Sequence, residues 1–181
     1  SRDLARPNDD DSFDRERSRK RVTAALLGTP EEASRIGPFF VLERLGAGGM
    51  GVVYAGYDPR LDRKVAIKLL QPAEGARSYS GQVDEEARER LLREARAMAK
   101  LTHPNVVAVH EVGLHDDEVF VAMAFVKGQT LRGWIDDGPH PISDVLEKLT
   151  QAGFGLAAAH DAGIIHRDFK PQNVLMGDDG T

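Results

Sequence analysis

A glycine-rich segment carries the first residue types whose spacing points to chemistry. Residues 46–53 read GAGGMGVV, a glycine spacing found in loops that bind phosphate through their backbone. Because glycine lacks a side chain, the backbone at Gly46, Gly48 and Gly51 can lie close over a triphosphate and direct N–H groups at its oxygens. The strand-like residues that follow argue against a dinucleotide fingerprint, which opens a helix. A plain hairpin turn stays open as an alternative.

A lysine and a glutamate downstream could extend this phosphate site. Lys68 ends the apolar run VAIK, and strand alternation places it on the same face as Ala66, where we expect the nucleotide. On a helix predicted from about 84 to 100, Glu94 falls at the edge of the apolar stripe. We expect Lys68 and Glu94 to pair, which would hold the lysine against phosphate. The alternatives are a solvated surface lysine and a glutamate bonded to a nearby arginine.

The segment 166–173 reads HRDFKPQN and makes the pattern specific. With the glycine loop, the VAIK lysine and the helix glutamate before it, in this order, the chain resembles a eukaryotic-type protein kinase of the bacterial serine/threonine sort. The resemblance covers about residues 39–181. One departure is Phe169, which stands where the family pattern has leucine, and this apolar exchange leaves the motif intact.

The resemblance assigns catalytic roles to Asp168, Lys170 and Asn173. Asp168 would accept or orient the proton of the attacking hydroxyl, and Asn173 would help to hold Mg²⁺ at the phosphates of ATP. Lys170 resembles the lysine that serine/threonine kinases place near the transferred phosphate. Arg167 resembles the arginine that receives a phosphorylated activation loop, and His166 is expected to pack structurally.

The resemblance also predicts the walls of the nucleotide pocket. The segment 123–128, MAFVKG, resembles the hinge, with Met123 as gatekeeper and backbone groups of Ala124 and Val126 bonding adenine. Ala124 departs from a commonly acidic position, at little cost because the backbone makes the contact. The other residues assigned to ATP are Leu45, Gly46, Ala47, Gly48, Gly49, Met50, Gly51, Val53, Ala66, Lys68, Glu94 and Leu175.

These motifs need a scaffold, and the sequence predicts an α+β, protein-kinase-like fold. Strands are expected at 39–45, 52–57, 65–70, 106–112 and 119–125, around the helix at about 84–100. They would make a five-stranded antiparallel N-lobe with one helix, followed by the beginning of a mainly helical C-lobe. A helix capped by Ser143 or Asp144 is expected to end at Gly163. The predicted units are a mobile charged leader at 1–36, the N-lobe and hinge at 37–127, and a partial C-lobe at 128–181.

Composition narrows the class of protein. The 181 residues carry a formal net charge of -5 and contain no cysteine, which argues against a nucleic-acid surface and excludes a disulfide framework. The longest apolar run, 119–126, is too short for a membrane-spanning helix. We expect a cytoplasmic domain that uses ATP and Mg²⁺ and acts on serine or threonine of protein substrates. The resemblance leaves room for sensor or membrane regions beyond Thr181.

The sequence through Thr181 contains no Asp-Phe-Gly motif, whose aspartate makes the main metal contact in this family. The chain is therefore expected to be part of a longer kinase and inactive by itself. Two other classes stay open: a nucleotide-binding or scaffolding module without catalysis, if the natural chain ends at Thr181, and a small-molecule phosphotransferase. The second shares the H-x-D-x-x-x-x-N logic but usually lacks this combination of VAIK, HRD and Lys170.

Overall fold

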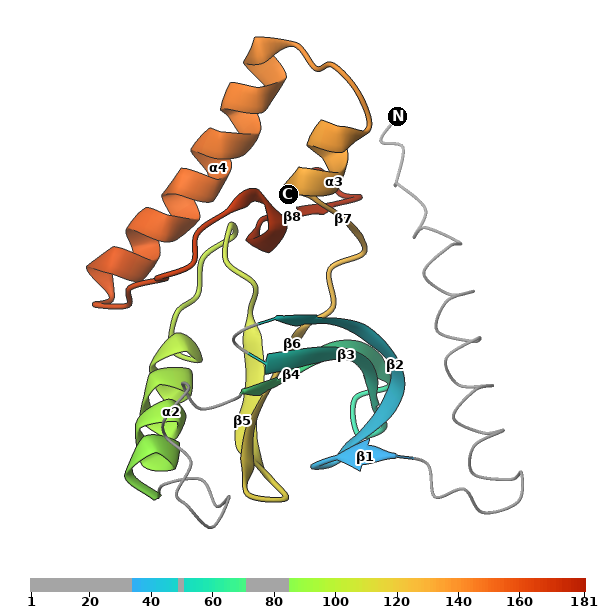
Figure 1. Cartoon of the computed structure of the whole chain (residues 1–181), viewed down its shortest axis with the longest axis vertical. Helices are drawn as coiled ribbons and strands as arrows, with labels where there is room; N and C mark the ends of the chain where they lie inside the picture. Colours follow the sequence, from blue (N-terminus) through green and yellow to red (C-terminus); the bar gives the residue numbers. More distant parts are fainter. Residues whose placement is uncertain (1–33, 49–50, 71–84) are drawn as a thin grey trace, which may run out of the picture.

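A computed structural model describes residues 34–48, 51–70 and 85–181. Its main feature is a six-stranded antiparallel sheet with the order β1-β2-β3-β4-β6-β5. Helix α2 lies beside this sheet, whereas α3, α4 and the small β7–β8 pair gather beyond one end of it (Figure 1). The segment that joins them is the one expected to be the hinge.

The strands of the main sheet are β1 (Arg35–Ile36), β2 (Phe39–Gly48), β3 (Gly51–Asp58), β4 (Arg63–Leu70), β5 (Val109–His115) and β6 (Glu118–Ala124). Register shifts interrupt two of the pairings. β2 slips against β3 between Val41 and Glu43 and between Arg44 and Gly46. β5 slips against β6 between Val109 and Glu111, so His110 occupies a bulge in β5.

Strand alternation gives the sheet two different faces. One face carries a core in which Phe39, Val65 and Ile67 are fully buried, together with Phe120 and Ala122. The other face packs against α2 (Glu85–Met98), whose Ala95 contacts the cluster formed by Val119 and Val121. A strand residue that follows Val65 or Ile67 therefore points away from the first core.

Two tight turns connect the strands. β5 and β6 are joined by Asp116 and Asp117, which both have positive φ angles, 46° and 65°. This conformation is typical of the type I′ turn of two-residue hairpins, for which aspartate is one of the tolerated residues. The β3–β4 turn instead ends on Asp62, at φ 49°, whose carboxylate accepts a hydrogen bond from the Tyr57 hydroxyl.

The second half of the chain contains α3 (Leu131–Asp136), α4 (Ile142–Asp161), the 3-10 turn η1 (Pro171–Asn173) and the strands β7 (Gly128–Thr130) and β8 (Leu175–Gly177). The Thr130 side chain caps α3 by accepting a hydrogen bond from Gly133 N. Gly163 follows the C-cap of α4 as the expected C′ glycine, at φ 74°, with the paired bonds Gly163 N to His160 O and Ile164 N to Ala159 O. Among the described residues, no helix is both long and apolar enough to cross a bilayer.

The structure corrects several boundaries expected from the sequence. A sixth strand, β1, begins at Arg35 within the segment expected to be a leader, and Ile36 is buried in the core. β5 starts at Val109 instead of 106. The predicted cap of α4 is wrong, because the helix begins at Ile142 with Pro141 before it and without a side-chain cap.

The approach of α4 to the loop before β5 gives a testable contrast between two glycines. A Cβ at Gly155 would overlap the backbone carbonyl of Asn105, whereas a Cβ at Gly153 would meet open space. We therefore expect Gly155→Ala to lower the free energy of unfolding by about 1–3 kcal/mol, as overpacking does. Gly153→Ala should raise it by about 0.5–1 kcal/mol, because alanine favours helix interiors. Urea unfolding of both variants would measure this, and equal effects would contradict the packing.

Candidate active site

The residues expected to face the nucleotide lie on the face of the sheet opposite the Ile67 core. Val53 pairs with both Gly46 and Lys68, and Lys68 pairs with Val121 on β6. Ala66 pairs in the same way with Met123. Because directly paired residues share a face, the glycine strand, the lysine and the gatekeeper position are brought to one surface.

The glycine loop forms the tip of the β2–β3 hairpin. Gly46, Ala47 and Gly48 are exposed on β2, as is the Leu45 side chain. Gly51 is buried at φ 123°, and a Cβ there would overlap the carbonyl of Leu69, so this position requires glycine. Gly49 and Met50 lie outside the described residues.

Lys68 lies in a partly desolvated position. Burial lowers the pKa of its ammonium group, and the negative charge of Asp168 opposes this shift. The negative charge of Asp168, in the segment 166–173 that we call the catalytic loop after its expected role, thus acts on a strand lysine 100 residues away in sequence. A cation with reduced hydration gains more from a phosphate partner than a solvated one does.

The expected ion pair between Lys68 and Glu94 is not formed in this structure. The Glu94 carboxylate lies instead 3.9 Å from a guanidinium nitrogen of Arg167, and both side chains are well exposed. An exposed pair at this distance contributes little to stability. Glu94 lies on α2, as predicted, and its partner is an arginine, which the sequence left open as the alternative.

The catalytic loop contains a strained turn at Arg167. This residue has a φ of 61°, and Asp168 N donates a 2.8 Å hydrogen bond to His166 O across it. A three-residue turn around a non-glycine residue with positive φ is rare, and it persists where the surroundings hold it. The His166 ring packs edge-on against Phe169, in agreement with a structural role for the histidine.

Asp168 is held by two side chains from the same loop. Lys170 Nζ lies 2.8 Å from Asp168 Oδ2, and Asn173 Nδ2 donates to both the Oδ2 and the backbone oxygen of Asp168, at 3.0 and 2.8 Å. The hydrogen bond from Lys170 lowers the pKa of Asp168 most, and Asn173 lowers it further. Asp168 is therefore ionised and oriented, with a third of its side chain exposed.

The hinge region runs from the end of β6 to β7. Ala124 N donates a 2.9 Å hydrogen bond to Ala108 O, and the side chains of Met123, Ala124 and Val126 are half-buried. Immediately after the hinge, Thr130 pairs with Leu175, and Leu131 N donates to Val174 O. The segment that contains Leu175 comes after the catalytic loop in the chain. These bonds attach that segment to the end of the hinge.

The side-chain oxygen atoms of the catalytic loop are suitable ligands for a hard cation. Asp168 supplies a carboxylate and Asn173 an amide oxygen, ligands that Mg²⁺ prefers, usually with water and substrate phosphate completing the shell. Within the described ranges, no group of three or more histidine, cysteine or acidic residues could hold a metal by itself. A bound Mg²⁺ would thus depend on phosphate oxygens and further ligands.

Comparison with known proteins agrees with this geometry. Residues 39–181 match the family model described as the protein kinase domain. The chain belongs to the protein kinase family. The kinase domain of Mycobacterium tuberculosis PknI has a similar structure, with a TM-score of 0.68 and 30% identity over 83% of this chain and 59% of that one. The expected α+β kinase fold is confirmed, with six strands in the main sheet instead of five.

Curated relatives of this kinase chain are serine/threonine-protein kinases from bacteria. The chain is 42% identical to pkn2 of Myxococcus xanthus over 147 residues, which are 81% of this chain and 17% of that protein. It is 41% identical to PknL of M. tuberculosis over 160 residues, 88% of this chain and 38% of PknL. The chain thus spans less than two fifths of the length of these relatives.

The contact between Lys170 and Asp168 makes a prediction about protonation. Replacing Lys170 by Met removes the bond that most lowers the pKa of Asp168, so we expect this pKa to rise toward the ordinary aspartate range. NMR titration of the Asp168 carboxyl carbon would measure the change. Lys148→Met, which removes a lysine near Glu147 on α4, is the control and should leave the titration unaltered. An unchanged pKa in the Lys170 variant would contradict the contact.

Proposed function

We propose that the protein carrying this chain transfers the γ-phosphoryl group of ATP to serine or threonine hydroxyls of protein substrates. The observation that carries the proposal is the ionised Asp168, oriented by Lys170 and Asn173 and close enough to Lys68 for their charges to interact. Phosphoryl transfer needs in-line positioning and charge neutralisation more than covalent help. The names of the bacterial relatives support the choice of substrate class.

Four side chains are proposed to act in that reaction: Asp168, Lys170, Asn173 and Lys68. When bound, Mg-ATP supplies the phosphoryl group and the metal charge that neutralises its oxygens. Asp168 orients the hydroxyl and accepts its proton, while Lys170, 2.8 Å away, stabilises negative charge near the transferred group. Asn173 would hold the metal through its amide oxygen. Lys68 contacts the phosphates from the sheet.

The nucleotide is proposed to lie between the glycine strand and the hinge. The backbone of Gly46, Gly48 and Gly51 covers the phosphates, while Ala124 and Val126 bond adenine through their backbone. Val53, Ala66, Met123 and Leu175 form the apolar walls. Because the reaction consumes ATP, the domain is proposed to act in the cytoplasm.

The Lys68 assignment can be tested by substitution in the full-length protein. We expect Lys68→Met to lower kcat/KM for ATP by about 100-fold or more, the range for loss of one charge-stabilising donor. The fold should persist, because Lys68 belongs to none of the buried core clusters formed by the described residues. Lys100→Met, an exposed lysine beyond α2, is the matched control. Wild-type turnover in Lys68→Met would refute the assignment.

The Asp168 assignment predicts a different kinetic pattern. Asp168→Asn should reduce kcat by about 10²- to 10⁴-fold, the range for a positioned general base, and leave ATP affinity little changed. Asp161→Asn, at the exposed end of α4, is the control. Radiolabelled transfer with ATP titration would separate the two parameters. An equal loss of affinity and of kcat would place Asp168 in nucleotide binding instead.

A further inference from the structure

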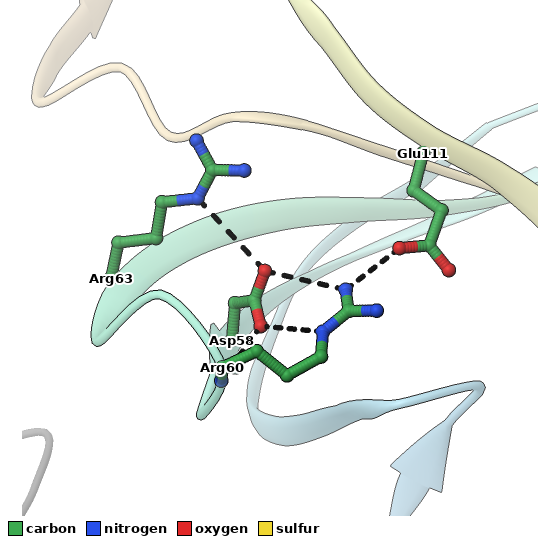
Figure 2. Close-up of polar contacts among 4 residues, drawn as sticks. All are labelled: Asp58, Arg60, Arg63 and Glu111. Carbon is green, nitrogen blue, oxygen red and sulfur yellow. Dashed lines mark hydrogen bonds and ion pairs between the residues drawn. The ribbon is translucent and has the colours of Figure 1, made fainter.

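A buried carboxylate lies in the sheet away from the catalytic loop. Asp58, the last residue of β3, is 1% exposed. It accepts hydrogen bonds from the backbone N of Arg60 at 3.0 Å and from Arg60 Nε at 3.1 Å, and Arg63 Nε lies 4.0 Å away (Figure 2). Burial alone would raise the pKa of Asp58, but the bonds from Arg60 outweigh it and the pKa is lowered. The carboxylate is thus a charged group that depends on its arginine.

The same arginine reaches a second carboxylate on a distant strand. Arg60 Nη2 donates a 2.7 Å hydrogen bond to Glu111 Oε2 on β5 (Figure 2). Its guanidinium also lies 5.3 Å from the ring centre of the buried Phe39. Because a guanidinium offers five donors in a fixed plane, it can bond both carboxylates at once, which a lysine cannot reproduce.

The Asp58–Arg60–Glu111 network spans the strand that leads into the hinge. β6 lies between β4 and β5 in the sheet, and its last residue, Ala124, pairs with Val65, two residues after Arg63. On its other side, β6 faces the irregular part of β5, where Glu111 follows the bulge at His110. Arg60, in the turn between β3 and β4, therefore connects the end of β3 to β5 across the ends of β4 and β6.

The network reaches β5 at the residue that follows the bulge. Next to a β-bulge the regular ladder is interrupted, so side-chain contacts contribute more to fixing the strand. Only two residues before the bulge, Ala108 O accepts the hydrogen bond of Ala124 N. Movement of β5 at Glu111 would thus pass directly to the backbone of Ala124.

We propose that the Asp58–Arg60–Glu111 network positions the hinge backbone for adenine, which makes these three residues positioning residues for nucleotide affinity. The proposal rests on the proposed function, because it takes Ala124 and Val126 as the adenine contacts. It differs from a purely stabilising role, which would alter the unfolding free energy and leave the folded hinge unchanged. It also differs from a role at the phosphates, which belongs to Lys68.

The test uses the full-length protein with Glu111→Gln and Arg60→Lys. The first removes one charge at a partly exposed position, and the second keeps a cation beside Asp58 but cannot bridge both carboxylates. Both variants should raise the Kd of ATP and of adenosine by the same factor, about three- to fivefold. Lys68→Met should weaken ATP alone. The double variant should lose no more than either single one, because the two residues act as a pair.

The matched control is Asp117→Asn, which breaks the ion pair between Arg88 and Asp117 at the opposite end of β5 and β6. It should leave both Kd values unchanged. Wild-type affinity for adenosine in Glu111→Gln and Arg60→Lys would overturn the proposal, as would an equal loss in Asp117→Asn.

A second measurement decides the proposal without nucleotide. Hydrogen exchange of the Ala124 amide should be several-fold faster in Glu111→Gln than in the wild type and unaltered in Asp117→Asn. Exchange at the wild-type rate in Glu111→Gln would refute the network's role. If the wild-type protein bound neither ATP nor adenosine, the proposed function would fail, while the exchange experiment would still decide whether the network positions the hinge.

Discussion

The register of β4 between β3 and β6 is the constraint on which the site depends. Ile67 and Val65 are fully buried in the core, and this fixes Ala66 and Lys68 on the opposite face. A slip of one residue would turn Lys68 into the core and Ile67 toward the proposed nucleotide. Burial of two apolar side chains thus determines where Lys68, the cation proposed to bind phosphate, lies, and the pairings of Lys68 with Val53 and Val121 follow from it.

Two opposite electrostatic environments meet where the sheet faces the catalytic loop. Burial works against the charge of Lys68, whereas hydrogen bonds from Lys170 and Asn173 favour the charge of Asp168. An anionic partner would therefore stabilise the charge of Lys68, whereas Asp168 already has hydrogen-bond partners that orient it. The lack of a Lys68–Glu94 contact, with Glu94 near Arg167 instead, leaves the lysine available to phosphate but without the carboxylate expected to hold it.

Sequence patterns predicted the parts of the fold that follow from periodicity and local motifs. The strands around Val53 and Lys68, the helix with Glu94 and the helix end at Gly163 are confirmed. The short β1 strand and the six-residue α3 were missed, because two to six residues carry too little periodicity and α3 contains Gly133. The Glu94 partner could not be predicted, since the sequence offered both Lys68 and several arginines. Nor could the bond between Arg60 and Glu111, which are brought together only by tertiary packing.

We propose that this chain forms the nucleotide-binding side of a protein kinase active site. The most direct measurement is ¹⁵N NMR of the full-length protein titrated with a non-hydrolysable ATP analogue, first without and then with Mg²⁺. We expect the analogue to shift the backbone amide signals of Ala124, Val126 and Gly51, and Mg²⁺ then to shift the side-chain amide signal of Asn173. Shifts confined to other surfaces, or an Asn173 signal that Mg²⁺ leaves unchanged, would contradict the proposed nucleotide site.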